Sequence, residues 1–253
     1  MTVVSIQMRH IMLGEGRPKV AVPITGHTSA EILEQARVIS EKRPDIVEWR
    51  IDFWNNVLDA NELESIANNL RHEIGEIALL TTFRTYGEGG EMKLSDSDYF
   101  KICRNVISLN LTDAIDLELF HDKTKIDSLL DLAKDQGIVS IMSSHDFKET
   151  PKQNVIVDRL KEMVDAKADV AKIAVMPKNV NDLLVLLKAT NEASSILSKP
   201  IITMSMGSLG KTSRVTGEIF GSSVTFATVG AASAPGQIPI ERLRAILDDL
   251  YLD

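Results

Sequence analysis

The chain has 253 residues, 44% hydrophobic and 25% charged, an ordinary globular composition that excludes fibrous and disordered classes. Its 28 basic and 36 acidic residues give a net charge of −8, which argues against nucleic acid or an anionic membrane surface as the main partner. The single cysteine, Cys103, excludes an internal disulfide framework, and no apolar run reaches the roughly 18 residues of a membrane span, so the composition predicts a cytoplasmic protein.

The first segment of the chain has the pattern of a hairpin that precedes the main architecture. Residues 3–13 are predicted to be extended, and Gly14-Glu15-Gly16 is a turn signal. Arg9 and His10 interrupt the apolar residues, so the segment lacks the continuous apolar core of a signal peptide. We therefore predict a hairpin extension over residues 1–17.

Strand-like and helical segments alternate from Lys19 onward. Short apolar runs predict eight strands, at 19–25, 46–52, 77–83, 114–119, 138–143, 170–175, 201–205 and 223–229. Apolar residues three and four positions apart predict helices around 32–39, 63–70, 99–106, 126–133, 183–187 and 240–250. Thr28 with Glu31, and Asp59 with Glu62, have the spacing of helix caps, and Asn181 is a further candidate cap. Only residues 205–223 look irregular, because they contain four glycines.

Regular alternation of strands and helices implies a parallel sheet. Eight units without a low-complexity linker favour closure into a single (β/α)₈ barrel domain spanning residues 1–253. An open doubly wound sheet is the alternative. It is weakened because no Gly-x-Gly-x-x-Gly follows the first strand.

Polar residues near the carboxyl ends of the strands are the candidates for a site, because a barrel enzyme builds its active site there. Glu48, Arg50 and Asp52 alternate along the second strand and share one face, as an internal ion-pair ladder or a binding surface. Arg84 follows the third strand, and the glycines around Glu88 allow backbone angles that turn its carboxylate inward.

Further candidates lie on the fourth and fifth strands. Asp116 and Glu118 have the same two-residue spacing and are candidate partners for the arginines. His145 ends the fifth strand, where its imidazole is suited to proton transfer near neutral pH. The next strand carries Lys172, so the two side chains are expected to face one cavity.

Lys172 lies inside an apolar strand, Asp169-Val170-Ala171-Lys172-Ile173-Ala174-Val175. Burying an ammonium group there costs several kcal/mol unless it is paired or loses its proton. A neutral lysine is a nucleophile for carbonyl carbon. The alternative, and the commoner fate of a strand lysine, is that the side chain extends its head group to solvent.

The last two units add a cation and a loop. Arg214, after the glycine-rich stretch, offers a bidentate fork for a carboxylate or phosphate. The segment Ala232-Ser233-Ala234-Pro235-Gly236-Gln237 is suited to closing over a ligand.

Taken together, these motifs resemble the type I 3-dehydroquinate dehydratases (3-dehydroquinases). The resemblance covers nearly the whole chain in one order. Its motifs are Glu48-Trp49-Arg50-Ile51-Asp52, Phe83-Arg84 with Glu88-Gly89-Gly90-Glu91, Ser143-Ser144-His145-Asp146-Phe147, Lys172 in its strand, Ser205-Met206 leading to Ser213-Arg214, and Ser233-Ala234-Pro235-Gly236-Gln237. It implies a (β/α)₈ barrel with the hairpin under its bottom, a homodimer, and no metal or organic cofactor.

The resemblance also implies an activity, reversible dehydration of 3-dehydroquinate to 3-dehydroshikimate in the shikimate pathway of aromatic amino-acid biosynthesis. Lys172 would form the Schiff base, His145 would be the general acid and base, and Glu88 would orient His145. Substrate-binding residues would be Glu48, Arg50, Arg84, Arg214, Ser233 and Gln237. Some members have a substrate-contacting serine at the end of the first strand, where this chain has Pro23, which leaves Thr25 or backbone to replace it.

Two other functions compete with this hypothesis. A class I aldolase also uses a barrel lysine and an imine, but it cleaves a carbon–carbon bond and often acts on phosphorylated substrates; the absence of an evident glycine-rich phosphate loop after the last two strands disfavours it. A barrel that only binds a small acid needs no nucleophile paired with a base, so Lys172, His145 and Glu88 together argue against it.

Overall fold

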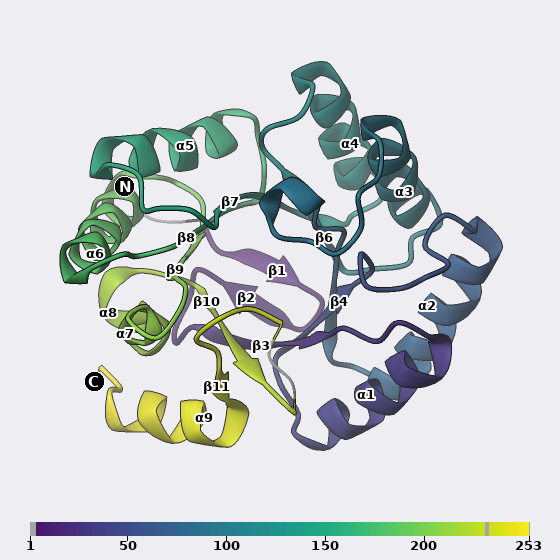
Figure 1. Cartoon of the computed structure of the whole chain (residues 1–253), viewed down its shortest axis with the longest axis horizontal. Helices are drawn as coiled ribbons and strands as arrows, with labels where there is room; N and C mark the ends of the chain where they lie inside the picture. Colours follow the sequence, from purple (N-terminus) through teal and green to yellow (C-terminus); the bar gives the residue numbers. More distant parts are fainter. Residues whose placement is uncertain (1–3, 231–232, 253) are drawn as a thin grey trace.

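The computed structural model describes residues 4–230 and 233–252. Predictions that fall on Val3, at the start of the expected hairpin, on Ala232, at the start of the last loop, and on the chain end at Asp253 lie outside these residues. Within the described residues a parallel sheet curls into a ring, and the helices surround it (Figure 1).

The eight predicted strands all occur in the described chain, with ends that differ by up to three residues. They are β3 (Lys19–Ile24), β4 (Ile46–Arg50), β5 (Ala78–Thr82), β6 (Ala114–Glu118), β7 (Val139–Asp146), β8 (Val170–Val175), β9 (Ile201–Ser205) and β10 (Val224–Thr228). The sheet order is β11-β10-β3-β4-β5-β6-β7-β8-β9, where β11 (Ile238–Pro239) is a two-residue addition beside β10.

The ring closes between β9 and β10. Ile201 and Ser222 form a parallel bridge there, and the Ser223 N–H donates to the Ile201 carbonyl at 2.8 Å. The (β/α)₈ barrel is therefore confirmed, and the open doubly wound sheet is wrong.

The helices lie outside the ring between successive strands (Figure 1). They are α1 (Ser29–Glu41), α2 (Ala60–Ile74), α3 (Asp96–Ser108), α4 (Lys123–Asp135), α5 (Gln153–Asp165), α6 (Val180–Ile196), α7 (Lys211–Val215), α8 (Gly217–Phe220) and α9 (Ile240–Asp249). In the part of the chain that the structure describes, none of them is long and apolar enough to cross a membrane.

The predicted caps are confirmed for two helices and wrong for a third. Thr28 forms a reciprocal capping box with Glu31 at the start of α1, and the Asp59 carboxylate accepts two backbone N–H groups of α2. Asn181 is not a cap. Asn179, two residues earlier, accepts from the Asp182 N–H and starts α6.

Helices α5, α7 and α8 were not predicted from the sequence, and one face of α6 was predicted wrongly. Helix α5 begins after Lys152, which makes no side-chain capping bond, so it lacks the usual start signal. Helices α7 and α8 fill the glycine-rich stretch but are too short to show periodicity. On α6, Leu184 is exposed and Leu186 is buried instead.

An antiparallel hairpin precedes the barrel, as predicted, but its turn is elsewhere. It consists of β1 (Ile6–Met8) and β2 (Ile11–Leu13), and the turn falls at Arg9 and His10, with Arg9 at a φ of 53°, rather than at Gly14-Glu15-Gly16.

The hairpin closes the end of the barrel at which the strands begin. Its buried residues Met8, Ile11 and Leu13 belong to the same apolar cluster as the inward-facing residues of the strands. Arg9 donates to the Glu76 carboxylate at 3.0 Å, just before β5 starts. The Val4 N–H donates to the Ser198 carbonyl at 2.8 Å, just before β9. The opposite end, where the strands finish, is left for a site.

Alternation along the strands decides which side chains reach the barrel interior. On β8, Ala171, Ile173 and Val175 pack in the core between sheet and helices, whereas Val170 and Ala174 belong to the interior cluster. Lys172 shares the parity of Val170 and Ala174, so it also points inward.

Candidate active site

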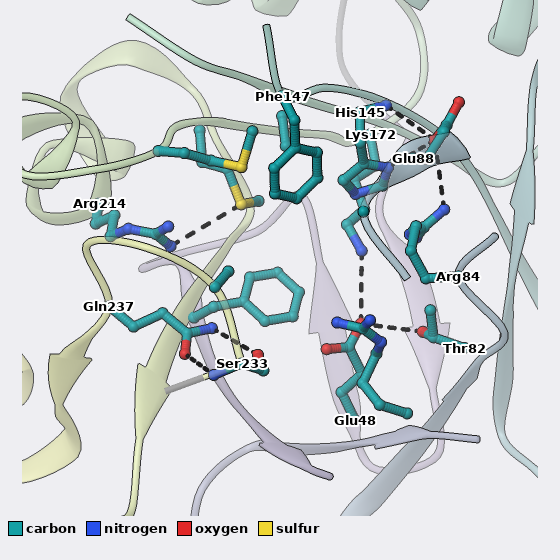
Figure 2. A pocket seen from close by; sticks show the side chains of 17 residues that line it. Glu48, Thr82, Arg84, Glu88, His145, Phe147, Lys172, Arg214, Ser233 and Gln237 are labelled. Atoms are coloured by element: carbon teal, nitrogen blue, oxygen red, sulfur yellow. Dashed lines mark hydrogen bonds and ion pairs between the residues drawn. The ribbon is translucent and has the colours of Figure 1, made fainter. Parts of the chain in front are cut away.

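A cavity opens at the carboxyl ends of the strands. All nine residues predicted for the site line it: Glu48, Arg50, Arg84, Glu88, His145, Lys172, Arg214, Ser233 and Gln237. Figure 2 shows two sides to it, with Lys172, His145, Glu88, Arg84 and Glu48 on one side and Arg214, Ser233 and Gln237 on the other. We call the first group the paired wall and the second the open wall.

Lys172 is buried, with 3% of its surface exposed, so the alternative of a solvent-extended side chain is wrong. Its Nζ donates to Asp116 Oδ2 at 2.9 Å and lies 3.6 Å from Glu48 Oε1. The Phe226 ring centroid is 5.0 Å from the same nitrogen. The burial cost of the ammonium is thus met by pairing with two carboxylates.

His145 and Glu88 are in direct contact. Glu88 Oε2 lies 3.0 Å from His145 Nδ1 and also accepts the His145 backbone N–H at 3.0 Å. The loop geometry directs this carboxylate inward, because Glu88 ends a 3₁₀ turn, η1 (Tyr86–Glu88), and Gly89 follows at a φ of 85°. A side chain at Gly90 would overlap the Arg84 carbonyl, so the sharp return of the loop requires glycine there.

Burial sets the protonation of this pair. It lowers the pKa of His145 well below its usual value, and the charges of Arg84 and Lys172 act in the same direction. Burial also raises the pKa of Glu88 to about 8, although Arg84 opposes the rise. Near pH 7 the pair therefore has no net charge, and its imidazole becomes available as a proton acceptor when the Glu88 carboxyl ionises.

Arg84 contacts three carboxylates at the paired wall. It donates to Asp116 at 2.7 Å and to Glu118 at 2.8 Å, and it lies 3.6 Å from Glu88. The prediction that Asp116 and Glu118 are partners of an arginine is confirmed. The additional pairing of Asp116 with Lys172 was not predicted from the sequence.

The ion-pair ladder expected on the second strand is only partly formed. Arg50 makes a bidentate pair with Asp52, at 2.7 and 2.8 Å. Glu48 instead accepts the Thr82 hydroxyl at 3.0 Å and faces Lys172. Glu48 and Arg50 therefore contribute to the cavity separately.

The open wall holds a cation without a counter-charge. Arg214 on α7 is 2% exposed, and no carboxylate within the described ranges lies at ion-pair distance. Its Nη2 donates to the Pro235 carbonyl at 3.1 Å, its Nη1 reaches only the Met204 sulfur at 4.0 Å, and its Nε has no partner among the described atoms. Burial lowers the pKa of this guanidinium to about 10.

The loop after β10 contributes Ser233 and Gln237 to the open wall. The Gln237 amide donates to the Ser233 hydroxyl at 3.1 Å and accepts the Ser233 backbone N–H at 3.0 Å. The Gly207 N–H donates to the Pro235 carbonyl at 3.1 Å and so anchors the loop. Among the described lining residues, neither Pro23 nor Thr25 is present.

The other lining residues were given no role in the site from the sequence, namely Thr82, Gly89, Phe147, Ala174, Met204, Met206, Phe226 and Ala234. A period-two pattern was available for some of them. Ala174 is two residues beyond Lys172, and Thr82 is directly beside Arg50 in the register of β4 and β5. No group of three or more His, Cys, Asp or Glu side chains in the described chain is placed to hold a metal ion.

Comparison with known proteins gives one consistent result. The family model for type I 3-dehydroquinase matches residues 20–253. A 3-dehydroquinate dehydratase of Lactiplantibacillus plantarum is 54% identical over 98% of this chain and 99% of that protein, and one of Clostridioides difficile is 44% identical over 97% of each.

Solved structures agree with these relatives. The type I 3-dehydroquinate dehydratase from Clostridium difficile with covalently modified comenic acid superposes with a TM-score of 0.95, at 43% identity over 98% of each chain. The 3-dehydroquinate dehydratase from Geobacillus kaustophilus also reaches a TM-score of 0.95, at 36% identity over 98% of this chain and 96% of that one.

Proposed function

Since the chain belongs to the type I 3-dehydroquinase family, and is thus a hydro-lyase, we propose that it dehydrates 3-dehydroquinate reversibly to 3-dehydroshikimate through an imine on Lys172. The observation that carries this proposal is the juxtaposition on β7 and β8. Ser143 is the register partner of Lys172, and His145, two residues on, faces the same cavity. A nucleophile and a proton-transfer group thus line one cavity.

Covalent capture is the first step. The Lys172 ammonium first passes one proton to the His145 imidazole, and the free amine adds to the ring ketone. The imidazolium then returns the proton to the carbinolamine hydroxyl, which leaves as water to give a protonated imine. The imine nitrogen draws electrons from the adjacent carbon, so that a proton on this carbon becomes removable by a weak base.

His145 then moves the proton. Its imidazole removes the proton from the carbon next to the imine, leaving an enamine with a neutral nitrogen. The enamine re-forms the imine by expelling the β-hydroxyl, and the imidazolium protonates the departing oxygen to give water. One further water hydrolyses the imine to the product ketone and free lysine, so the net change is loss of one water.

The remaining site residues are proposed to bind and orient the substrate. Glu88 holds the imidazole through the 3.0 Å contact at Nδ1. Arg214 is proposed to take the substrate carboxylate, because this guanidinium is buried with its Nε unpartnered in the described structure. The groups proposed for the substrate hydroxyls and for closing the site are Glu48, Arg50, Arg84, Ser233 and Gln237.

The domain assignment, location, oligomeric state and pathway are also proposals. We assign residues 1–253 to one barrel domain with the hairpin extension 1–17, acting in the cytoplasm as a homodimer in the shikimate pathway, without a cofactor. The charge balance and the single cysteine support the location, and the family resemblance supports the dimer. Sedimentation velocity tests the dimer directly.

Turnover and trapping together test the chemistry. With 3-dehydroquinate, absorbance should rise at the conjugated enone band, and borohydride with substrate should add one ligand mass to the chain at Lys172. Turnover without an adduct would refute the imine. An adduct with a carbon–carbon cleavage product would identify an aldolase, and neither turnover nor adduct would leave only a binding protein.

A further inference from the structure

Asp116 lies beneath the cavity rather than on its surface. Its side chain is fully buried, and its carboxylate accepts three side-chain donors. Lys172 Nζ is at 2.9 Å, Arg84 Nη2 at 2.7 Å and the Ser143 hydroxyl at 2.6 Å. Such a carboxylate is fixed in place and cannot turn toward a ligand.

The carboxylate of Asp116 stays ionised. Burial alone would raise its pKa, but the charges of Arg84 and Lys172 outweigh burial and hold the pKa well below its usual value. It therefore presents a permanent negative charge to Nζ. Glu48 is a weaker candidate for this role, because it is farther from Nζ, at 3.6 Å, and accepts the Thr82 hydroxyl.

We propose that Asp116 is the counter-ion of the protonated imine, and so a catalytic residue that keeps this nitrogen charged while the adjacent carbon loses its proton. The proposal rests on the imine assigned above to Lys172. An imine formed at Nζ carries the same single positive charge as the ammonium, in the same place, so the 2.9 Å contact is retained. In the enamine the nitrogen is neutral but keeps its N–H, which still donates to Asp116.

Several charged groups surround this pair and contribute to its titration. Those facing Asp116 and Nζ are Glu48 and Arg50 on β4, Arg84 after β5, Glu88 in η1, Glu118 on β6 and His145 on β7. Asp116 differs from the other acids here because it alone, among the described residues, accepts a hydrogen bond from Nζ within 3.0 Å.

The test uses the full chain with the product 3-dehydroshikimate, whose conjugated imine absorbs at longer wavelength when protonated than when neutral. In the unaltered protein the bound imine should remain protonated from pH 6 to 9. In Asp116→Asn the pH at which it loses its proton should fall by about one to three units, because an adjacent opposite charge shifts titration by that amount. The pH at which kcat falls in the alkaline range should be lowered together with it.

Glu118→Gln is the matched control. It removes the other buried carboxylate that holds Arg84, at 2.8 Å, and leaves the contact between Asp116 and Lys172 in place. The titration of its imine should move far less than in Asp116→Asn, because Glu118 makes no hydrogen bond with Nζ. If Asp116 has only a structural role, Asp116→Asn should reduce the amount of imine without changing the pH at which the imine loses its proton. That result, or an equal shift of this pH in Glu118→Gln, would overturn the proposal.

Two further measurements cover a variant that does not fold and a protein that forms no imine. If Asp116→Asn does not fold, Asp116→Glu, which keeps the charge, should preserve the protonated imine at pH 9, and its loss there would count against the counter-ion. If the unaltered protein forms no adduct with borohydride, the imine itself fails. An adduct with an unmoved titration removes only the role of Asp116.

Discussion

Arg84 and Arg214 are both buried guanidinium groups beside the same cavity, yet their surroundings differ. Arg84 faces Asp116, Glu118 and Glu88, and although burial opposes it, these carboxylates raise its pKa well above the usual value. Arg214 has no carboxylate partner in the described chain, and burial lowers its pKa to about 10. A buried charge without a partner costs several kcal/mol, so the fold keeps Arg214 at a cost that an anionic ligand would offset.

This difference separates the chemistry from the binding. The paired wall satisfies its own charges, so its geometry is set before a ligand enters. The open wall is electrostatically incomplete, which favours a ligand with one negative group at that side. Substitutions on the two walls should therefore affect different kinetic constants.

The largest effect is expected on the paired wall from Lys172→Ala. This change removes the only amine proposed to form the imine, so turnover should disappear and mass spectrometry after borohydride and substrate should show no adduct. An adduct in this variant would place the covalent chemistry on another residue. The assignment of chemistry to the paired wall and binding to the open wall would then be wrong.

His145→Ala should lower turnover by about 10² to 10⁴ or more while leaving the amine in place. Borohydride should therefore still trap substrate or product on Lys172, as mass spectrometry would show. Normal turnover in this variant would mean that another group moves the proton.

Arg214→Lys tests the open wall. A point ammonium cannot reproduce the two-pronged binding of a carboxylate by guanidinium, so substrate binding should weaken by about 2 kcal/mol, or roughly 30-fold, mainly in KM. Steady-state kinetics measure this, with Lys211→Arg on the same helix as a control that keeps Arg214. An unchanged KM would show that the substrate carboxylate binds elsewhere.

The pH dependence of kcat should reveal the Glu88 and His145 pair. Below about pH 8 the Glu88 carboxyl is protonated and donates to Nδ1, so the ring proton occupies Nε2 and the imidazole cannot act as a base. Deprotonation of Glu88 moves the ring proton to Nδ1 and frees Nε2. The rate should therefore rise about tenfold between pH 7 and its plateau, and Glu88→Gln should abolish this limb.

The smallest expected effect is that of a chelator, which should not change turnover. The imine supplies the electrophile, and no cluster of His, Cys, Asp or Glu in the sequence has metal-ligand spacing. Loss of activity with EDTA that a divalent ion restores would overturn the proposal that the imine, rather than a metal, supplies the electrophile.

The strands could be predicted because each one contains a short, mostly apolar run, a pattern that depends only on local sequence. The inward direction of Lys172 follows from the same alternation with Val170 and Ala174. Helix α5 was missed although Ile156, Leu160 and Met163 have helical spacing, because no capping side chain marks its start.

The pairing inside the site could not be predicted. Asp116 and Lys172 lie on strands separated by β7, and only closure of the ring fixes which inward side chains meet across the interior. No sequence pattern shows that Glu48 faces Lys172 while Arg50 pairs with Asp52. Motif order identified the residues, whereas their partners depend on tertiary geometry.

The hairpin under the barrel has a consequence for the order of folding. It is synthesised before any barrel strand, yet it shares its apolar cluster with Phe226 on β10 and its Val4 N–H binds the Ser198 carbonyl. Contacts between such distant parts of a chain form slowly, because the intervening loop must close first. Met8, Ile11 and Leu13 therefore obtain their complete set of partners only when the ring is nearly complete, and sealing of the barrel is a late event in folding.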